Sequence, residues 1–266
     1  MERETKRVFL GMECHAPWPD EFPKGRILAP EDRHVTLAFI GNVEVDPFLE
    51  HLKKIPLPPF TLGFAGSFNH CHFFPKKHPH VVAWEVDVKK RRSELLDYQK
   101  NIEEWLAEGN YHVDDRDFIP HMTISRGKFS IDKWKKAFTP LPLYLCNIHL
   151  YESAGSSRYQ PIWTHSLPAP FTEFEHTADI AFEVRGRNIG EIFDHALTAL
   201  AFQCPEILQF ADDAMQPENL DDVVMLLNRI VGMADAEVGT PLKAVSYHGK
   251  LKERTDYWDW EMIVDV

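Results

Sequence analysis

Two four-residue segments with one shared pattern (histidine, apolar, threonine, apolar) constrain the fold of this chain more than any other feature. They are residues 34–37 (HVTL) and residues 121–124 (HMTI). Side chains alternate between the two faces of a strand, so each segment predicts a strand that buries its apolar residues and presents an imidazole and a hydroxyl together. A glycine follows each segment within a few residues, at Gly41 and Gly127. One such segment is more often an ordinary strand, but the repetition favours a shared site.

The residue types in these segments suit phosphate chemistry. Two facing imidazoles, His34 and His121, can act as an acid–base pair, one taking a proton from water and the other giving one to a departing ribose oxygen. The hydroxyls of Thr36 and Thr123 can bind phosphoryl oxygens. Arg126 carries the planar guanidinium that binds phosphate through two hydrogen bonds. We therefore predict that both segments line one active site that moves protons without a metal ion.

The proline-rich segment SLPAP (166–170) marks the best domain boundary, because proline continues neither a helix nor a central strand. We predict a first domain of residues 1–165, a linker of residues 166–170 and a second domain of residues 171–266. Charge divides at the same place. Residues 1–168 hold 22 basic and 22 acidic side chains, and the remainder carries the whole net charge of −12. The neutral first domain can gather cations around a phosphate, whereas the acidic second domain better suits a metal or a protein than nucleic acid.

Hydrophobic periodicity predicts an α+β fold for both domains, with two similar lobes in the first and a small unit in the second. In the first domain the expected strands are residues 8–12, 34–40, 81–88, 121–125, 143–152 and 159–164, and the expected helices are residues 47–55, 93–108 and 132–137. In the second domain the expected strands are residues 180–185, 242–247 and 258–264, and the expected helices are residues 188–201 and 220–233. Asn188, with Glu191 three residues later, predicts a capping box for the first of these two helices.

Composition limits the class of protein. A hydrophobic content of 44% supplies a core, and no apolar run approaches the roughly 20 residues that span a bilayer. The first residues lead into no secretory-type apolar segment. The four cysteines (Cys14, Cys71, Cys146 and Cys204) are far apart and form no Cys-x-x-Cys pair, which argues against a disulfide framework or a thiolate zinc site. We expect a cytoplasmic protein that does not bind membranes.

Longer stretches around the two segments carry a family resemblance: RVFL from residue 7, PEDRHVTLAFIG from residue 30, FIPHMTISR from residue 118, LYES from residue 150, and Tyr159. Residues 6 to about 165 resemble the two-histidine phosphoesterase superfamily, in particular its RNA 2′,3′-cyclic phosphodiesterase branch, also called 2′-5′ RNA ligases. The resemblance implies a bilobal fold with one cleft and hydrolysis of an RNA 2′,3′-cyclic phosphate to a 2′-phosphomonoester without a cofactor. It implies that His34 protonates the leaving O3′, that His121 activates water and that Tyr159 contacts substrate. RNA with a 2′-5′ linkage is a second implied substrate.

Two basic segments leave alternatives open. Residues 69–80 (NHCHFFPKKHPH) contain His-x-His twice, a spacing compatible with a transition-metal site. We favour a loop beside the cleft that offers aromatic and basic side chains to bases and phosphates. Residues 89–92 (KKRR) can contact an RNA backbone, although such a run is usually a solvated face.

Carboxylates stand near both ends of the second domain. Asp179 and Asp265, if adjacent, can bind a hard divalent cation such as Ca²⁺ or Mg²⁺, although two solvated carboxylates are the simpler interpretation. The stretches EHTAD from residue 175, LKAVSYH from residue 242 and the terminal VDV resemble archease, a family that assists an RNA-splicing ligase. The resemblance implies Asp179 and Asp265 as metal ligands, Lys243 as a functional residue and such a ligase as partner. The domain is shorter than archease between residues 233 and 241, so a minimal or degenerate archease is one outcome.

Two main classes of function are compatible with the sequence. One is an RNA-end-processing phosphodiesterase with a fused archease-like domain. The other is a non-catalytic protein that binds nucleotides or RNA ends as an accessory to an RNA ligase. Both histidine segments and Arg126 are intact, which favours the enzyme. A third option, a metallohydrolase that uses residues 69–80, predicts sensitivity to a chelator.

Overall fold

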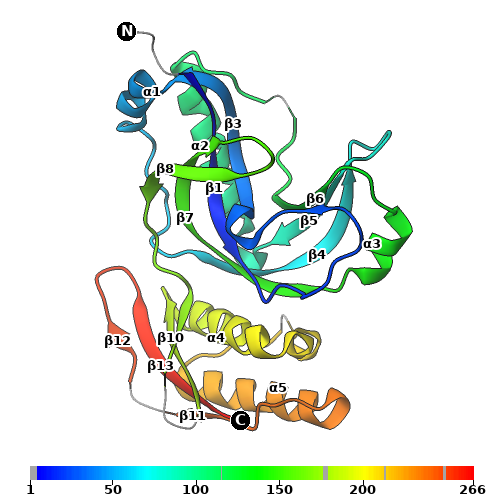
Figure 1. The fold of residues 1–266 in the computed structure, drawn as a ribbon. Coiled ribbons are helices and arrows are strands. Elements are labelled where there is room, and N and C mark those ends of the chain that lie inside the picture. The colour runs from blue at the N-terminus through cyan, green and yellow to red at the C-terminus, as the bar shows by residue number, and fades with distance from the viewer. Residues whose placement is uncertain (1–4, 115, 176–178, 213, 248–249) are drawn as a thin grey trace.

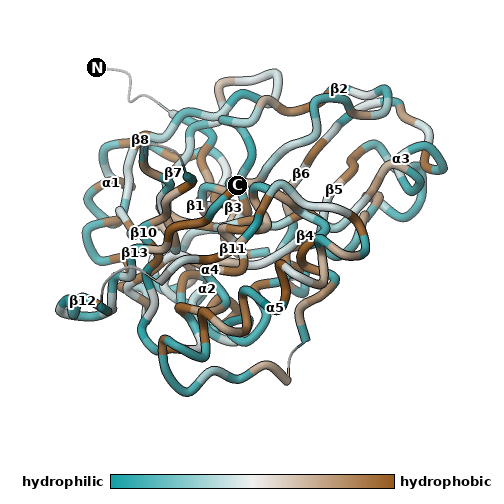
Figure 2. The backbone as a smooth tube through the Cα atoms, turned by 90° about the horizontal axis from the view of Figure 1, so that it is seen from below, coloured by the Kyte–Doolittle hydropathy of each residue, from teal (hydrophilic) through white to brown (hydrophobic). Residues whose placement is uncertain are grey.

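The computed structural model describes residues 5–114, 116–175, 179–212, 214–247 and 250–266. These residues form two units, each with a sheet and a hydrophobic core of its own. Strand β8 ends at His165 and strand β9 begins at Phe171, so residues 166–170 connect the two sheets. Figure 1 shows the second unit below the first, and Figure 2 shows hydrophobic residues gathered along the strands while outer segments such as β12 are hydrophilic.

The first sheet closes on itself, because β1 (Thr5–His15) pairs with both β3 (His34–Glu44) and β7 (Leu141–Ser153). From β3 the order continues through β6, β5 and β4 to β7, and all pairings are antiparallel. In Figure 1 the sheet divides into two lobes, one around β1, β3, β7 and β8 and the other around β4, β5 and β6. The remaining strands are β2 (Arg26–Ile27), β4 (Phe64–Phe74), β5 (Val81–Asp87), β6 (His121–Arg126) and β8 (Tyr159–His165).

Three α-helices lie on the described part of the first unit: α1 (Val45–Leu52), α2 (Arg92–Glu108) and α3 (Ile131–Ala137). Helix α2 buries Leu95, Tyr98 and Ile102, which recur at helical spacing and pack in the core. The side-chain amide of Gln99 on the same helix donates a hydrogen bond of 3.2 Å to the carbonyl of Leu37. This bond ties the helix to the strand that begins at His34.

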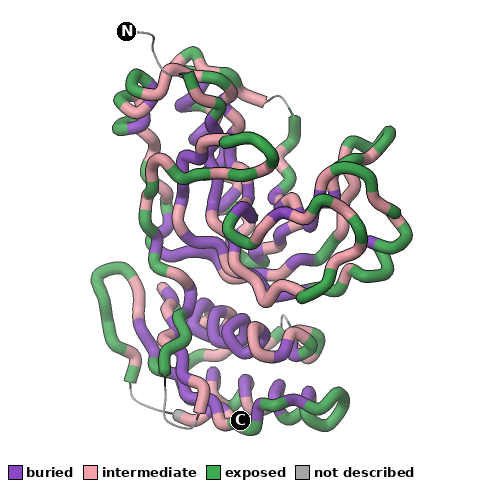
Figure 3. Tube along the Cα trace, in the orientation of Figure 1, coloured by how far each residue is buried: buried purple, intermediate pink, exposed green. Residues whose placement is uncertain are grey.

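The second unit has four strands in the order β11, β13, β10, β9, with β12 added to β13. Their bounds are β9 (Phe171–Phe174), β10 (Ile180–Gly186), β11 (Ala244–Tyr247), β12 (Lys252–Glu253) and β13 (Trp258–Asp265). Helices α4 (Ile189–Gln203) and α5 (Leu220–Val238) cover one face of this sheet, and Figure 3 shows their inner sides buried. The side-chain oxygen of Asn188 accepts a hydrogen bond of 3.0 Å from the backbone N–H of Glu191, which caps α4 as predicted. The Glu191 carboxylate binds Arg187, so the second half of the predicted capping box does not form.

The sequence predictions omit four strands. Residues 69–74 were expected in a loop and instead belong to β4, where their mixed polar and aromatic sequence shows no alternation of burial. Strands β2 and β12 have only two residues each and β9 has only four, too few for a periodic signal. No helix in the described part of the chain has the length and apolar character needed to cross a membrane.

Candidate active site

Strands β3 and β6 bring the two histidine segments together where the two lobes meet. Val35 pairs with Met122, and both side chains are fully buried. The residues on either side of this pair therefore point to the opposite face, as the alternation predicts. In an antiparallel pair each histidine then lies across from the threonine of the other strand: His34 from Thr123, and His121 from Thr36. The two histidines are diagonal neighbours with Cβ atoms roughly 7 Å apart, which leaves room for a phosphate between the rings.

Both imidazoles are held in the same way. Nδ1 of His34 lies 2.8 Å from the carbonyl oxygen of Asp32, and Nδ1 of His121 lies 2.7 Å from the carbonyl oxygen of Ile119. A carbonyl oxygen only accepts hydrogen bonds, so Nδ1 carries the hydrogen in both rings. Nε2 is therefore the nitrogen that exchanges protons with a substrate.

Burial lowers the pKa of both histidines. For His34 the pKa falls to about 4, first because the ring is removed from water and then because Arg126 is close by. For His121 burial is again the largest cause, and the nearby His72 and Arg116 act in the same direction. Both rings are therefore neutral at neutral pH in the free protein. A bound anion favours the protonated ring and opposes these effects.

Glycine, aspartate and tyrosine residues around His34 fix the position of its ring. A Cβ at Gly11 would lie 2.9 Å from the carbonyl oxygen of Val35 and 3.4 Å from Cδ2 of His34, so only glycine lets the ring lie over β1. The Tyr159 ring meets His34 edge-on, with centroids 4.8 Å apart. A carboxylate oxygen of Asp32 accepts a hydrogen bond of 2.7 Å from the backbone N–H of Tyr159, which anchors the start of β8 beside the site.

A cavity of about 360 Å³ opens beside His34. Three arginines line it (Arg7, Arg26 and Arg126), and none of the described lining residues is a carboxylate. Three guanidinium groups without a neighbouring carboxylate attract an anion. The other lining residues are Phe9, His34, Thr36, Phe39, Ser153, Gly155, Ser156, Ser157 and Tyr159.

Arg126 is the arginine best placed to bind a ligand. Its Nε is buried and makes no hydrogen bond with any described residue. A buried polar atom without a partner costs about 1–3 kcal/mol, so a ligand that accepts from Arg126 recovers that free energy. Strand β2 pairs Arg26 directly with Arg126, and the Arg7 guanidinium lies 4.8 Å from the centroid of the Phe39 ring.

Sequence reasoning identified Arg126 and Tyr159 but missed other parts of this cavity. Arg7 stands in a matched stretch and shares a strand face with Phe9, so alternation alone was a usable signal. Arg26 had no such signal, because β2 has only two residues. Residues 155–157 have φ values of 83°, 53° and 63°, and their Gly-Ser-Ser sequence indicates a turn without indicating that it lines a cavity.

The end of β4 builds the side of the site near His121. The rings of His70, His72 and Phe74 stack in series, with centroids 5.8 Å and 5.6 Å apart. The Phe74 ring lies 5.4 Å from that of His121, and Glu85 is paired with His121 across β5 and β6. His72 Nε2 is 2.8 Å from a carboxylate oxygen of Glu85. Among described residues the histidines of this segment join no group of three potential metal ligands. The favoured position beside the cleft therefore agrees with the structure, although the segment is a strand there.

The candidate residues of the second unit meet at one end of its sheet. The register of β10 and β13 puts Asp179 and Asp265 at adjoining positions. The backbone N–H of Lys243 donates a hydrogen bond of 2.8 Å to the carbonyl of Asp265, and the Ser246 hydroxyl lies 3.3 Å from the Asp265 carboxylate. The carboxylates of Asp179 and Asp265 and the hydroxyl of Ser246 offer oxygen ligands, which suits a hard cation. Residues 176–178 and 248 of the archease-like stretches lie outside the described residues.

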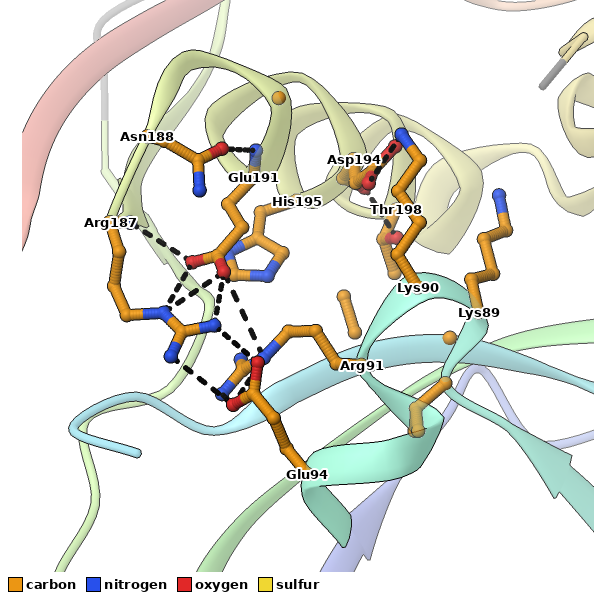
Figure 4. A pocket seen from close by; sticks show the side chains of 14 residues that line it. Lys89, Lys90, Arg91, Glu94, Arg187, Asn188, Glu191, Asp194, His195 and Thr198 are labelled. Carbon is orange, nitrogen blue, oxygen red and sulfur yellow. Dashed lines mark hydrogen bonds and ion pairs between the residues drawn. The ribbon is translucent and has the colours of Figure 1, made fainter. Parts of the chain in front are cut away.

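A second cavity of about 240 Å³ lies between the two units (Figure 4). Most of its charges are paired: Arg187 binds Glu94 at 2.7 Å and also binds Glu191, and Arg91 binds Glu94 at 3.1 Å. Of residues 89–92, expected as a solvated face or an RNA contact, Lys89 and Lys90 line this cavity and stay exposed, Arg91 is buried, and Arg92 lies 3.7 Å from Glu85 of the first unit. The cavity is a junction between the units, lined by four basic side chains (Lys89, Lys90, Arg91 and Arg187) and three carboxylates (Glu94, Glu191 and Asp194).

Comparisons with known proteins agree with the geometry of the first unit. A family model described as the 2′-5′ RNA ligase superfamily matches residues 26–156. A Thermotoga maritima protein named RNA 2′,3′-cyclic phosphodiesterase is 28% identical over 138 residues, which is 47% of this chain and 69% of that protein. A Geobacillus stearothermophilus protein of the same name is 27% identical over 149 residues, which is 54% of this chain and 38% of that protein.

Solved structures give a weaker likeness. That of Escherichia coli LigT complexed with 3′-AMP has a TM-score of 0.47 and 20% identity, and the match covers 62% of this chain and 99% of LigT. The family model ends at residue 156 and does not extend into the second unit. The first unit of this chain is thus similar to the 2′-5′ RNA ligase superfamily, and both of its histidine segments lie inside the matched residues.

Proposed function

We propose that the first unit hydrolyses RNA 2′,3′-cyclic phosphate ends to 2′-phosphomonoesters, with His34 and His121 as its acid–base pair. One observation carries this proposal. Two imidazoles with identically held Nδ1 atoms lie on paired strands, and one of them, His34, lines a cavity with three arginines and no carboxylate among its described lining residues. An anionic ester that must lose one proton and gain another fits this arrangement. The four curated relatives named RNA 2′,3′-cyclic phosphodiesterase support the same activity.

The reaction requires two proton transfers. Neutral His121 accepts a proton from water as the water oxygen attacks phosphorus, and protonated His34 gives its proton to O3′ as the P–O3′ bond breaks. Because burial lowers the pKa of His34 to about 4, the ring takes up its proton together with the anionic substrate. The products are a 2′-phosphomonoester and a 3′-hydroxyl. The same transfers with a 5′-hydroxyl in place of water join a 2′-5′ linkage, and their reverse cleaves it.

The different surroundings of the two histidines support this division of roles. The cavity beside His34 has three aromatic side chains on which an RNA base can stack, which brings the ribose O3′ close to this ring. Arg126, Thr36 and Thr123 then bind phosphoryl oxygens. His121 does not line the cavity and is only half-buried, so water can reach its ring.

To test the proposal, an RNA oligonucleotide that ends in a 2′,3′-cyclic phosphate is incubated with the purified full chain, once with EDTA and once without it. We expect a 2′-phosphate product in both conditions. His34→Ala and His121→Ala should each lose it, whereas the control His165→Ala, which changes a histidine at the far end of β8, should retain it.

Two other results would each point to a different function. Binding of the oligonucleotide without any product would favour the non-catalytic accessory of an RNA ligase. A product that disappears with EDTA would favour a metallohydrolase. Formation of a 3′-phosphate in place of a 2′-phosphate would contradict the proposed cleavage of the P–O3′ bond.

For the second unit we propose an archease-like role in which Asp179 and Asp265 hold a divalent cation, Lys243 acts beside them and an RNA-splicing ligase is the partner. The adjoining positions of the two carboxylates and the hydroxyl of Ser246 support the cation site. Ca²⁺ or Mg²⁺ should raise the melting temperature of the full chain, and Asp265→Asn should abolish that rise. An equal rise in Asp265→Asn would refute the cation site and leave the proposal for the first unit untouched.

A further inference from the structure

A second cluster of polar side chains lies in the first unit, on strands β1 and β7, which run side by side (Figure 1). Glu13 and His15 are two residues apart on β1 and therefore share a face. On β7 the core residues are Leu143 and Leu145 and then Ile148 and Leu150, so the spacing between core positions changes from two to three. The register between β1 and β7 shifts at the same place, as in a β-bulge.

The bulge determines where Cys146 points. In a regular strand Cys146 and its neighbour Asn147 face opposite sides, but here both side chains reach the carboxylate of Glu13. Cys146 is buried, yet it is not a member of the hydrophobic core, unlike Cys14 on the neighbouring strand. The fold thus removes this thiol from the core and places it in a polar cluster.

Potential ligand atoms of four side chains converge in this cluster. The donor atoms of Glu13, His15 and Cys146 all lie within 4.8 Å of one another. From the Glu13 carboxylate the distances are 3.0 Å to Nε2 of His15, 3.5 Å to Sγ of Cys146 and 3.6 Å to Nε2 of His149. The last distance is too long for a hydrogen bond, so Nε2 of His149 faces the carboxylate across a gap.

Neighbouring residues orient the cluster. Nδ1 of His149 lies 2.8 Å from the hydroxyl of Thr164, which leaves Nε2 directed at Glu13. The Asn147 side-chain oxygen accepts a hydrogen bond from the backbone N–H of Leu167, and its nitrogen donates to Glu13. Ligating histidines in metalloproteins are held in this manner through their second nitrogen.

We propose that Glu13, His15, Cys146 and His149 bind one divalent transition-metal ion of the zinc type. One carboxylate, two imidazoles and one thiolate are ligands that zinc accepts in a tetrahedral site, and the sulfur selects against magnesium and calcium. The thiol proton of Cys146 leaves to solvent when the sulfur ligates the ion.

The observed separations match the size of such a site. Zinc–nitrogen and zinc–oxygen bonds near 2.0 Å and zinc–sulfur bonds near 2.3 Å give tetrahedral ligand–ligand edges of roughly 3.3–3.6 Å. The three separations from the Glu13 carboxylate, 3.0, 3.5 and 3.6 Å, lie near these edges, and the ligand atoms of His15 and Cys146 lie within 4.8 Å of each other, so binding draws His15, Cys146 and His149 closer together around the ion. The His15 side chain is 40% exposed and that of His149 only 10%, so an ion enters from the His15 side.

The chain contains two internal comparisons for this cluster. Cys204 is also buried and its thiol lies 3.6 Å from a carboxylate oxygen of Glu206, but no histidine shares that group in the described residues. Cys71 stands between His70 and His72, yet these three residues form no common group of ligand atoms. The site therefore does not rest on a lone cysteine or on a His-x-His spacing. It is also independent of the proposed phosphodiesterase, because neither His34 nor His121 is a ligand.

Cobalt spectroscopy of the full chain tests the proposal. The protein is stripped with EDTA, exchanged into buffer under reducing anaerobic conditions and titrated with Co²⁺. We expect one equivalent to give intense visible bands of tetrahedral cobalt and a near-ultraviolet sulfur-to-cobalt charge-transfer band, both displaced by Zn²⁺. Cys146→Ser should lose the charge-transfer band, whereas Cys71→Ser and Cys204→Ser should keep it. His15→Ala, which changes an exposed side chain and should fold normally, should weaken cobalt binding by at least about tenfold.

Each contrary result would overturn the proposal. A wild-type chain without a charge-transfer band at one equivalent of Co²⁺ has no thiolate site. A band that survives in Cys146→Ser and disappears in Cys71→Ser assigns the metal to the end of β4. Unchanged cobalt affinity in His15→Ala, with the fold verified by circular dichroism, removes the histidine ligand on which the geometry depends.

Discussion

Replacement of Arg126 by methionine should make the free protein more stable and the enzyme much less active. The buried Nε of Arg126 has no hydrogen-bond partner among described residues, and Arg7 and Arg26 line the same cavity without a compensating carboxylate. Methionine has a similar length and no polar group to leave unsatisfied. We expect the free energy of unfolding to rise by about 1–2 kcal/mol, the cost of one unsatisfied buried donor. For a protein of this size each kcal/mol raises the melting temperature by about 2–4 °C.

The loss of activity follows from the same side chain. A hydrogen bond to a charged group contributes about 1.5–3 kcal/mol, and a guanidinium binds a phosphoryl group through two such bonds. Loss of about 3–4 kcal/mol from the transition state lowers kcat/KM by about 100- to 1,000-fold. Arg126→Lys keeps the charge but not the planar two-pronged geometry, so its kcat/KM should fall between those of wild type and Arg126→Met.

Calorimetry and kinetics together test this reasoning. Melting curves are recorded with and without inorganic phosphate, and rates are measured on an RNA 2′,3′-cyclic phosphate end. Phosphate should stabilise the wild type by binding the folded state, and this stabilisation should disappear in Arg126→Met. If Arg126→Met melts below the wild type, or keeps both its phosphate response and its activity, Arg126 is a structural residue and the assignment of the anion cavity is wrong.

Substitutions at four further positions test other parts of the structure. His34→Ala and His121→Ala should each lower kcat by about 100- to 10,000-fold in the cyclic phosphate assay, because each removes one proton transfer. Because the pKa of His34 is lowered to about 4, the folded state gives up stability as the pH falls from about 6.5 towards 4. Urea unfolding of wild type should then show an acid loss of up to about 3 kcal/mol that is absent in His34→Asn. Gly11→Ala should lower kcat by about tenfold or more, since its Cβ would clash with the carbonyl oxygen of Val35 and shift strand β3 next to His34, and a crystal structure should show that histidine displaced. Glu191→Gln should destabilise the chain by about 2–4 kcal/mol in urea unfolding, because the buried Arg91 loses part of its compensating charge.

The parts of the site that the sequence predicted are those set by local geometry. Alternation along a strand is sufficient to place His34 and Thr36 on one face, and the same holds for His121 and Thr123. Arg126 follows because it lies on the same short strand as the second histidine. The pairing of the two strands belongs to the tertiary structure. Only the repetition of the pattern indicated that they would meet.

The parts that escaped prediction depend on contacts between distant segments. Residues 89–92 are indistinguishable in sequence from a solvated basic run, yet Arg91 is buried, because it donates to the carbonyls of Leu62 and Gly63 and lies 3.9 Å from Glu191 of the second unit. Arg26 enters the cavity because a two-residue strand pairs with β6. Cys146 joins a polar cluster because a bulge shifts the register of β7, and although the spacing of core positions changes there from two to three, the sequence does not show that Glu13 on β1 lies opposite the bulge.

The two histidines are equivalent in their own hydrogen bonds and unequal in their surroundings. His34 adjoins the three arginines of the cavity, whereas His121 adjoins Phe74 and is paired with Glu85. The positive charge of Arg126 holds down the pKa of both rings, and an anion bound against that arginine cancels its effect most strongly at the ring nearest the cavity. In the proposed reaction the ring that gains a proton on substrate binding is therefore His34. Arg7, Arg26 and Arg126 thus determine which histidine acts as the acid in the proposed reaction, because the two histidine segments alone would leave the acid and the base interchangeable.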